Sequence, residues 1–318
     1  MSESRDRLPA FGQDRTASPV ASAARRRLRA RPALLALTAL LSVVAAHAHE
    51  FRMGATLTYA ENFSRTSYTP TAQDAKVADV DAAYIQTKQL APNWTLIAAL
   101  EGNAEYVSEF SALNRLSAGA RATVRHKFGL GPMVPVLDAG VALTSVNFRE
   151  SGRSGWRTEG FATLSQRLTE SWRVAATANW ESFTASHAPF DTHARRVGLE
   201  TTYDVTETWQ FGAGASRLHG QLVANAAWSV WSQAIGGALG PTIQQYYTSI
   251  PWEVSNTFGS GWVAYRVDCR ADFWWAQLTA RVSDSTSIPL RFESVKVINH
   301  VGVRYDSAFW SLGVLHRF

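Results

Sequence analysis

The sequence predicts an all-β fold, a transmembrane antiparallel up-and-down β-barrel. Three observations lead to this fold class: apolar and polar residues alternate in many segments, these segments are about ten residues long, and the connections between them alternate between tight and long. Alternation of this kind is typical of a strand with one apolar and one polar face. Tilted strands of about 9–11 residues can cross a bilayer, and a closed barrel pairs every backbone polar group, as lipid requires.

The first 48 residues differ from the rest of the chain in charge. The formal net charge is +5, and these 48 residues contain eight arginines and three acids, which leaves 23 basic and 23 acidic residues beyond them. The remainder is therefore neutral, and no nucleic-acid partner is expected of it.

The same segment carries the features of a Sec-type signal peptide. Arg25–Pro32 is strongly basic, Ala33–Ala46 has no charge, and Ala46–Ala48 places small residues at both ends of an A-x-A cleavage site. This order is typical of a secretory signal, and the apolar run is too short for a membrane-spanning helix. We predict cleavage after Ala48, so that residues 1–48 form a leader and residues 49–318 form the barrel. The single cysteine, Cys269, excludes a disulfide within the chain.

The alternation is clearest in Arg115–Phe128, where one face is basic and the other is apolar apart from His126. Single-chain bacterial barrels have an even number of strands. The sequence therefore predicts 12–14 strands, with 14 preferred. Leu222–Trp231 is the candidate that raises the count from 13 to 14. No amphipathic helix is predicted, and the rest of the region 221–260 is expected to form loops or an irregular pair of strands. The other predicted strands are Arg52–Ala60, Val77–Leu90, Trp94–Val107, Pro135–Phe148, Gly155–Leu168, Trp172–Phe183, Arg195–Val205, Trp209–Leu218, Trp262–Asp268, Phe273–Val282, Val295–Tyr305 and Phe309–Phe318.

The last ten residues, FWSLGVLHRF, place Trp310, Leu312, Val314 and Phe318 on one face of a strand. This segment resembles the C-terminal signal of bacterial outer-membrane β-barrel proteins, although His316 departs from it. The resemblance implies export through the periplasm, recognition of Phe318 by the barrel assembly machinery, and a location in the cell outer membrane. The expected surroundings are outer-membrane lipid and lipopolysaccharide.

The polar faces of the strands are expected to line the lumen. Arg115, Arg121, Arg125 and Lys127 form a basic ladder on one strand. Pairing of Val107 with Arg115 would place Glu101 opposite Arg121, an arrangement that contributes about 0.2–1 kcal/mol. The acids expected to face the ladder are Glu101, Glu105 and Asp138. Further charges expected in the lumen are Arg157, Glu159, Arg173, Glu181, Arg196, Glu200, Asp204, Arg266, Asp268, Arg281, Lys296 and Arg304.

These patterns favour a porin-like channel for passive diffusion of small polar solutes, with no cofactor and no catalysis. The same charges could instead fill and rigidify a closed lumen. The second reading is therefore a closed structural barrel, an adhesin or a receptor that acts through its extracellular loops. A lipid-modifying enzyme of the outer membrane is the third.

One loop, HAPFDTH, combines three residues that can bind divalent metals, His187, Asp191 and His193. They are weak candidates, because a loop that contains proline does not fix ligand directions as a helix does. No glycine-rich phosphate loop and no CxxC pair is present in the sequence.

Overall fold

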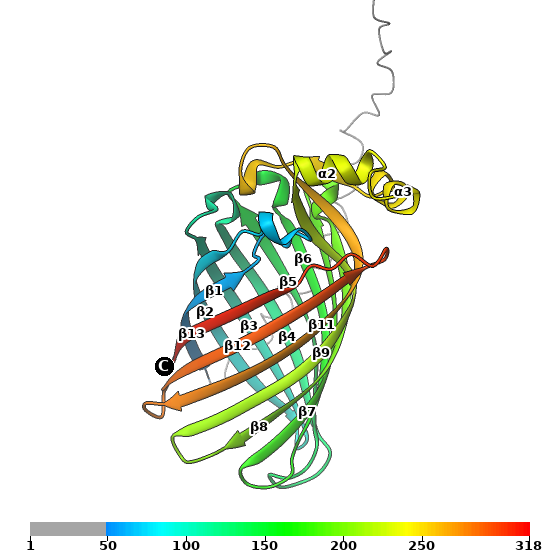
Figure 1. The fold of residues 1–318 in the computed structure, drawn as a ribbon. Helices are drawn as coiled ribbons and strands as arrows, with labels where there is room; N and C mark the ends of the chain where they lie inside the picture. Colours follow the sequence, from blue (N-terminus) through cyan, green and yellow to red (C-terminus); the bar gives the residue numbers. More distant parts are fainter. Residues whose placement is uncertain (1–48) are drawn as a thin grey trace, which may run out of the picture. The chain divides into compact units, whose positions relative to one another are not determined.

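The chain forms a closed antiparallel barrel in this computed structural model, which describes residues 49–318 (Figure 1). Consecutive strands pair with each other, β13 pairs with β1, and β9 pairs with β11, so that twelve strands close the barrel. The predicted signal peptide and its cleavage after Ala48 lie outside the described residues. The twelve strands are β1 (His49–Glu61), β2 (Ala75–Ala91), β3 (Trp94–Val107), β4 (Arg115–Lys127), β5 (Val136–Phe148), β6 (Gly155–Arg167), β7 (Trp172–Ala185), β8 (Thr192–Asp204), β9 (Trp209–Ala227), β11 (Trp262–Arg281), β12 (Thr286–Asn299) and β13 (Ser307–Arg317).

The fold class is confirmed, and the strand number lies within the predicted range, but the preference for fourteen strands is wrong. Two pairs of predicted strands are continuous: 209–218 joins 222–227 in β9, and 262–268 joins 273–281 in β11. Gly220 interrupts the alternation in β9 and suggests a turn. In the structure it lies inside the strand, where a Cβ atom would come within 2.3 Å of the His193 carbonyl oxygen of β8. A glycine in a strand often marks such a close backbone approach.

The region 221–260 contains two helices that were not predicted, α2 (Trp228–Ile235) and α3 (Pro241–Ser249), and the short strand β10 (Trp252–Val254), which pairs only with β11. Helices of eight and nine residues are shorter than the window in which helical periodicity becomes visible. Packing stabilises them instead: Trp231 of α2 and Tyr247 of α3 contact Tyr265 of β11. Neither helix of the described chain is long and apolar enough to span a bilayer.

The connections differ in length between the two ends of the barrel. At one end they span residues 92–93, 128–135, 168–171, 205–208 and 282–285. The loops at the other end are mostly longer and contain five 3₁₀ turns, at Thr69–Thr71, Ser111–Leu113, Ser151–Arg153, Ala188–Phe190 and Asn256–Phe258. The helices α2 and α3 lie at one side of this second end (Figure 1). Tight turns face the periplasm in bacterial barrels, which makes the helical end extracellular.

The first strand begins and the last strand ends at the tight-turn end of the barrel. Arg52 lies opposite Arg317 in the β1–β13 pairing, and the Phe318 N–H donates to the Phe51 carbonyl oxygen at 2.8 Å. The two phenylalanine rings lie 5.6 Å apart. The C-terminal residue thus completes the last strand, whereas its recognition by the barrel assembly machinery stays a prediction.

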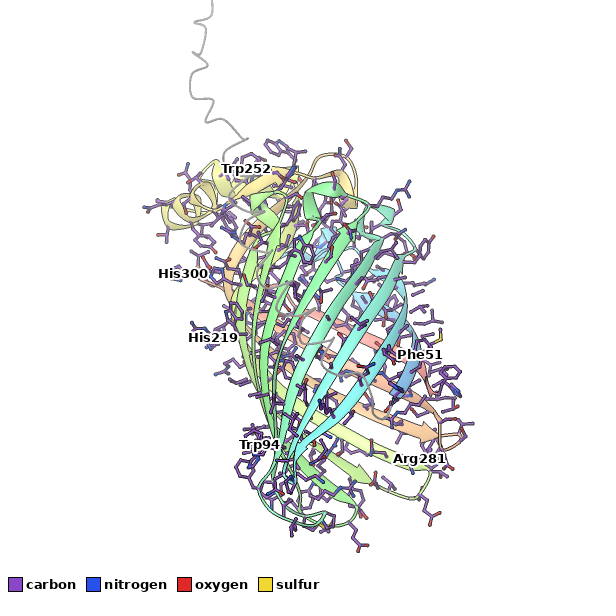
Figure 2. The ribbon with its side chains drawn as sticks, turned by 180° about the vertical axis from the view of Figure 1, so that it is seen from behind. Phe51, Trp94, His219, Trp252, Arg281 and His300 are labelled. Atoms are coloured by element: carbon purple, nitrogen blue, oxygen red, sulfur yellow. The ribbon has the colours of Figure 1, made fainter. Side chains whose placement is uncertain are left out.

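The outer wall is apolar and carries aromatic rings near both ends of the strands. Leu57 and Leu199 project from its middle and are 65 % and 70 % exposed. Rings of this kind are favoured at the two surfaces of a membrane, so the wall fits a bilayer. The exposed rings near the tight turns are Phe51, Tyr84, Trp94 (Figure 2), Phe128, Trp172, Tyr203, Trp209 and Phe318, and those farther along the strands are Tyr59, Tyr106, Trp156, Trp180, Trp274 and Trp310.

Trp275 provides a test of packing inside the barrel. Its indole ring lies over Gly214, where an added Cβ atom would come within 2.7 Å of the ring. Gly214→Ala should therefore force the ring to move and lower the free energy of unfolding by about 1–3 kcal/mol. The temperature at which the folded gel band converts to the unfolded one measures this effect. Gly102→Ala is the control, because nothing lies within 4 Å of its added Cβ atom. Equal conversion temperatures for the two variants would contradict the prediction.

Candidate functional site: the charged lumen

Three arginines of the predicted ladder on β4 point into the barrel and form ion pairs with acids of neighbouring strands. Arg115 Nη2 lies 2.7 Å from Glu105 Oε2, and Arg121 Nε lies 2.9 Å from Glu101 Oε1. Arg125 donates two hydrogen bonds to Asp138, at 2.8 and 2.9 Å. Lys127 is exposed and makes no ion pair within residues 49–318.

The expected pairing of β3 with β4 is wrong by two residues. Arg115 lies opposite Glu105 rather than Val107, and Arg121 lies opposite Ala99. The Val107 N–H instead donates to the Asn114 side chain at 2.8 Å, so the connecting loop uses the end of β3. Arg121 still reaches Glu101, because a long side chain can contact the diagonal neighbour on the next strand.

The ladder is therefore close to neutral. Each of its three arginines has a carboxylate partner, and Arg121 also lies 3.6 Å from Glu159. The ladder borders a cavity of about 400 Å³ that four arginines and three acids line. Its charged lining residues are Arg52, Asp81, Glu101, Arg115, Arg121, Arg157 and Glu159.

A second cavity of about 410 Å³ has a different charge balance. It shares Arg115 and Arg157 with the first cavity and extends to residues of the extracellular loops. Only one acid, Glu181, contributes to its lining. Five arginines line it: Arg65, Arg115, Arg153, Arg157 and Arg196.

Two of these five arginines have no carboxylate partner. Arg196 donates to the Ser216 hydroxyl at 2.7 Å and lies 4.1 Å over the Phe273 ring. Arg65 makes no salt bridge in the part of the chain that the structure describes. Its side chain is accessible from the lumen but enclosed by protein, and this enclosure lowers its pKa. Arginine nevertheless stays charged in proteins, so the second cavity carries a surplus of positive charge.

Phenylalanine rings hold three of the guanidinium groups in place. Arg153 lies 4.1 Å from the centre of the Phe190 ring, and Arg115 and Arg157 lie 5.7 and 5.8 Å from the rings of Phe148 and Phe183. A guanidinium over a ring face is attracted by the negative face of the ring. The arrangement keeps the charged groups at the wall of the cavity, where their remaining N–H donors can bind a carboxylate or phosphate of a solute.

An ion pair connects three extracellular loops above this cavity. Arg153 Nε donates to Glu150 Oε2 at 2.5 Å, and the same carboxylate accepts hydrogen bonds from Thr257 at 2.7 Å and Ser255 at 3.0 Å. Burial alone would raise the pKa of Glu150, but Arg153 and the two hydroxyls hold it below its ordinary value. With Phe190 on Arg153, the contacts link the loops 149–154, 186–191 and 255–261.

The candidate metal ligands do not come together. His187 Nδ1 lies 2.9 Å from Glu253 Oε2, and Asp191 Oδ1 accepts a hydrogen bond from the Ala185 N–H at 2.6 Å. His193 is exposed on β8. No group of three potential metal ligands occurs anywhere between His49 and Phe318.

The sequence missed some lumen residues and misplaced others. Arg65 and Arg153 lie in loops, where no periodic pattern assigns a side chain to either face. Asp268 and Lys296 were expected inside, but both are exposed on outward positions of β11 and β12. The inward positions there belong to Phe273 and Trp275, which contact Arg196 and Arg291.

Comparison with known proteins supports the fold. No protein-family model and no curated protein sequence matches the chain. An outer-membrane channel from Pseudomonas putida F1 is similar in structure, with 11 % identity, a TM-score of 0.55, and 86 % of this chain and 97 % of that chain covered. The NanC porin has 8 % identity and a TM-score of 0.43 over 83 % of this chain and 98 % of its own. An active-site mutant of outer-membrane phospholipase A from Escherichia coli has 10 % identity and a TM-score of 0.43, over 83 % and 89 %.

The barrel, its apolar outer wall and the first of these likenesses define the class of protein. The chain is a bacterial outer-membrane β-barrel protein, and its location is the cell outer membrane.

The loop contacts of Glu150 lead to a prediction. Glu150→Gln removes charge-assisted hydrogen bonds that contribute about 1.5–3 kcal/mol, so protease should cleave the loop 255–261 at least severalfold faster.

Because the pKa of Glu150 is lowered by folding, its contribution to stability is present above the ordinary glutamate pKa of about 4.3 and is lost as the pH falls through the lowered value. Acid should therefore loosen the loops of the unmodified protein but hardly affect the variant. The exposed Glu61→Gln is the control, and equal cleavage of all three proteins would contradict the prediction.

Proposed function

We propose that this protein is a porin-like channel through which small polar solutes diffuse passively, with a preference for anions. The observation that carries the proposal is the cavity near the extracellular end, which five arginines line and in which two of them, Arg65 and Arg196, have no carboxylate partner within the described chain. The channel character of the Pseudomonas putida protein supports it, although the likeness itself concerns the fold alone.

The two cavities suggest how a solute would pass. They share Arg115 and Arg157, so an anion held near Arg65 and Arg196 could move on towards the paired charges of the β4 ladder. Conduction requires sites that attract a solute but also release it. The unpaired arginines supply attraction, and the ion pairs beyond them supply many weak contacts of both signs. No cofactor and no chemical step is part of this mechanism.

A closed barrel that acts through its loops is the second candidate. The helices α2 and α3 lie at the extracellular end, and Trp228 and Trp252 are 47 % and 38 % exposed there, with ring centres 6.5 Å apart. Adjacent exposed indoles suit contact with a sugar or a protein. A lipid-modifying enzyme remains the third, and altered lipid A or phospholipids after overexpression would favour it over both.

The channel proposal predicts a selectivity for anions. The refolded protein in a planar bilayer should show stable conductance steps and a reversal potential that favours anions in a KCl gradient. Arg65→Gln combined with Arg196→Gln should lower the anion-to-cation permeability ratio severalfold, because it removes the surplus charge of the cavity. The matched control is Arg195→Gln with Lys296→Gln, which removes two positive charges from the outer wall and should leave the ratio unchanged.

Two results would contradict this proposal. A folded, heat-modifiable barrel that never conducts would mean that the lumen is closed, and the loop-based function would replace the channel. A conducting barrel whose permeability ratio is equal in the two double variants would remove Arg65 and Arg196 from the ion pathway.

The second prediction concerns the ladder. Arg121→Ala with Arg125→Ala leaves Glu101, Glu159 and Asp138 without their partners, so the lumen gains negative charge. Selectivity should shift towards cations, as measured by the reversal potential in the same salt gradient. Replacement of both arginines by lysine should restore most of the original value, and an unchanged potential in the alanine variant would exclude a role of the ladder in conduction.

A further inference from the structure

The outer wall carries a charged patch that the channel does not use. It consists of Arg195 on β8, Arg217 and His219 on β9, Arg270 and Asp272 on β11, and Lys296 on β12. All six occupy outward positions, and most are well exposed. Figure 2 shows His219 projecting from the outer wall.

Strand pairing brings these residues together in two rows. Arg195 lies opposite His219, which lies opposite Arg270. Next to this row, Arg217 lies opposite Asp272, which lies opposite Lys296. Side chains opposite each other on neighbouring strands are about 5 Å apart at Cβ, so the patch is compact.

The patch begins where the outer aromatic rings end. Arg195 lies opposite Trp180 of β7, and Asp272 lies two residues beyond Trp274 on the same face of β11. Charged side chains cost about 2–4 kcal/mol at the middle of a membrane and about 0–1 kcal/mol near its surfaces. The five charged side chains and His219 therefore lie at the level of the lipid headgroups, on the extracellular side.

The charges of the patch do not balance. Asp272 pairs with Arg217 at 2.6 Å and is 4.0 Å from Arg270. Asp268, two residues from Arg270 on the same face of β11, accepts a hydrogen bond from Gln221. Arg195 and Lys296 make no ion pair with any residue of the described barrel. Arg195 and Arg270 flank His219 in a row that contains no acid, and a bound anion would offset the repulsion between the two guanidinium groups.

An apolar groove lies next to the patch on its periplasmic side. It has a volume of about 800 Å³, and small residues such as Ala176 and Ala215 form its floor between Leu164, Leu199 and Trp274. Leu199 is four residues from Arg195 on the same face of β8, and Ala215 is two residues from Arg217 on β9. Charged groups above and an apolar groove below match the two parts of a lipid.

We propose that this surface binds a phosphorylated lipid of the outer leaflet, the lipid A part of lipopolysaccharide. Its phosphate groups contact Arg195, Arg217 and Lys296, and one acyl chain lies in the groove. Arginine suits this role because its fork of donors fits phosphate oxygens. The extracellular position of the patch selects the outer leaflet. The proposal does not depend on conduction through the lumen.

The test uses the refolded protein in detergent, with binding of bis-phosphorylated lipid A measured by native mass spectrometry. We expect one tightly bound lipid, and affinity at least tenfold lower in Arg195→Gln with Lys296→Gln. Ala215→Leu, which fills the groove without changing charge, should also weaken binding. The charge-matched control is Arg167→Gln with Arg173→Gln at the periplasmic end, which should bind like the unmodified protein. Heat modifiability establishes that each variant is folded.

The choice of probe identifies the group that is recognised. Lipid A without phosphates should bind at least tenfold more weakly, and inorganic phosphate alone should not displace the intact lipid. Equal binding of the dephosphorylated lipid, or equal affinity of the outer-wall double variant, would overturn the proposal. Equally tight binding of phosphatidylglycerol at the same residues would overturn the assignment to lipid A.

Discussion

Every part of this structure depends on the pairing of backbone groups in a medium without water. An unpaired N–H or C=O group in lipid costs several kcal/mol, so the sheet must close on itself. The pairing of β13 with β1 meets this requirement. The first residue of β1 and the last residue of β13 both lie at the tight-turn end of the barrel. Once the sheet is closed, strict alternation assigns every side chain either to the lumen or to the lipid.

Alternation places some charged side chains in the lumen and others on the outer wall, and the two sets have different surroundings. Inside, the arginines of β4 are matched by acids on neighbouring strands, which offsets part of the desolvation cost of these charges. Arg196 differs because its surroundings supply a hydroxyl and a ring contact instead of a carboxylate. Outside, the charges of β8 to β12 occur only beyond the aromatic rings. In the two functions that we propose, the same residue types would act on a solute in one place and on lipid headgroups in the other.

The sequence was sufficient for the fold class, because a period of two repeated along the chain has few alternative explanations. It also identified the ladder and its acid partners, since Glu101, Glu105 and Asp138 follow directly from strand parity and hairpin order. The strand number was harder to predict. Gly220 and the polar run 268–272 look like breaks, yet both lie within long strands that continue past their neighbours.

The errors in the site have a related cause. Charge was taken as the mark of the lumen, which fails for Asp268 and Lys296 because the outer wall also carries charges near the membrane surface. Arg65 could not be found at all. It lies in a loop with a positive φ of 50°, and only the folded barrel brings it beside Arg153 and Cys269. The helices α2 and α3 are too short for their periodicity to be seen and depend on contacts with Tyr265 and Tyr305.

The contact between the first and last strands also determines the order of events during assembly. Eleven of the twelve pairings join strands that follow each other along the chain, although β9 and β11 are separated by the helical insertion. The remaining pairing joins residues as distant as Thr58 and Ser311, 253 positions apart. Ordering so long a chain before any contact forms is slow, so we expect the hairpins to form first and the β1–β13 seam to form last. Until then, β1 and β13 are the two free edges of the sheet, and the growing barrel can be guided or captured by another protein at these edges.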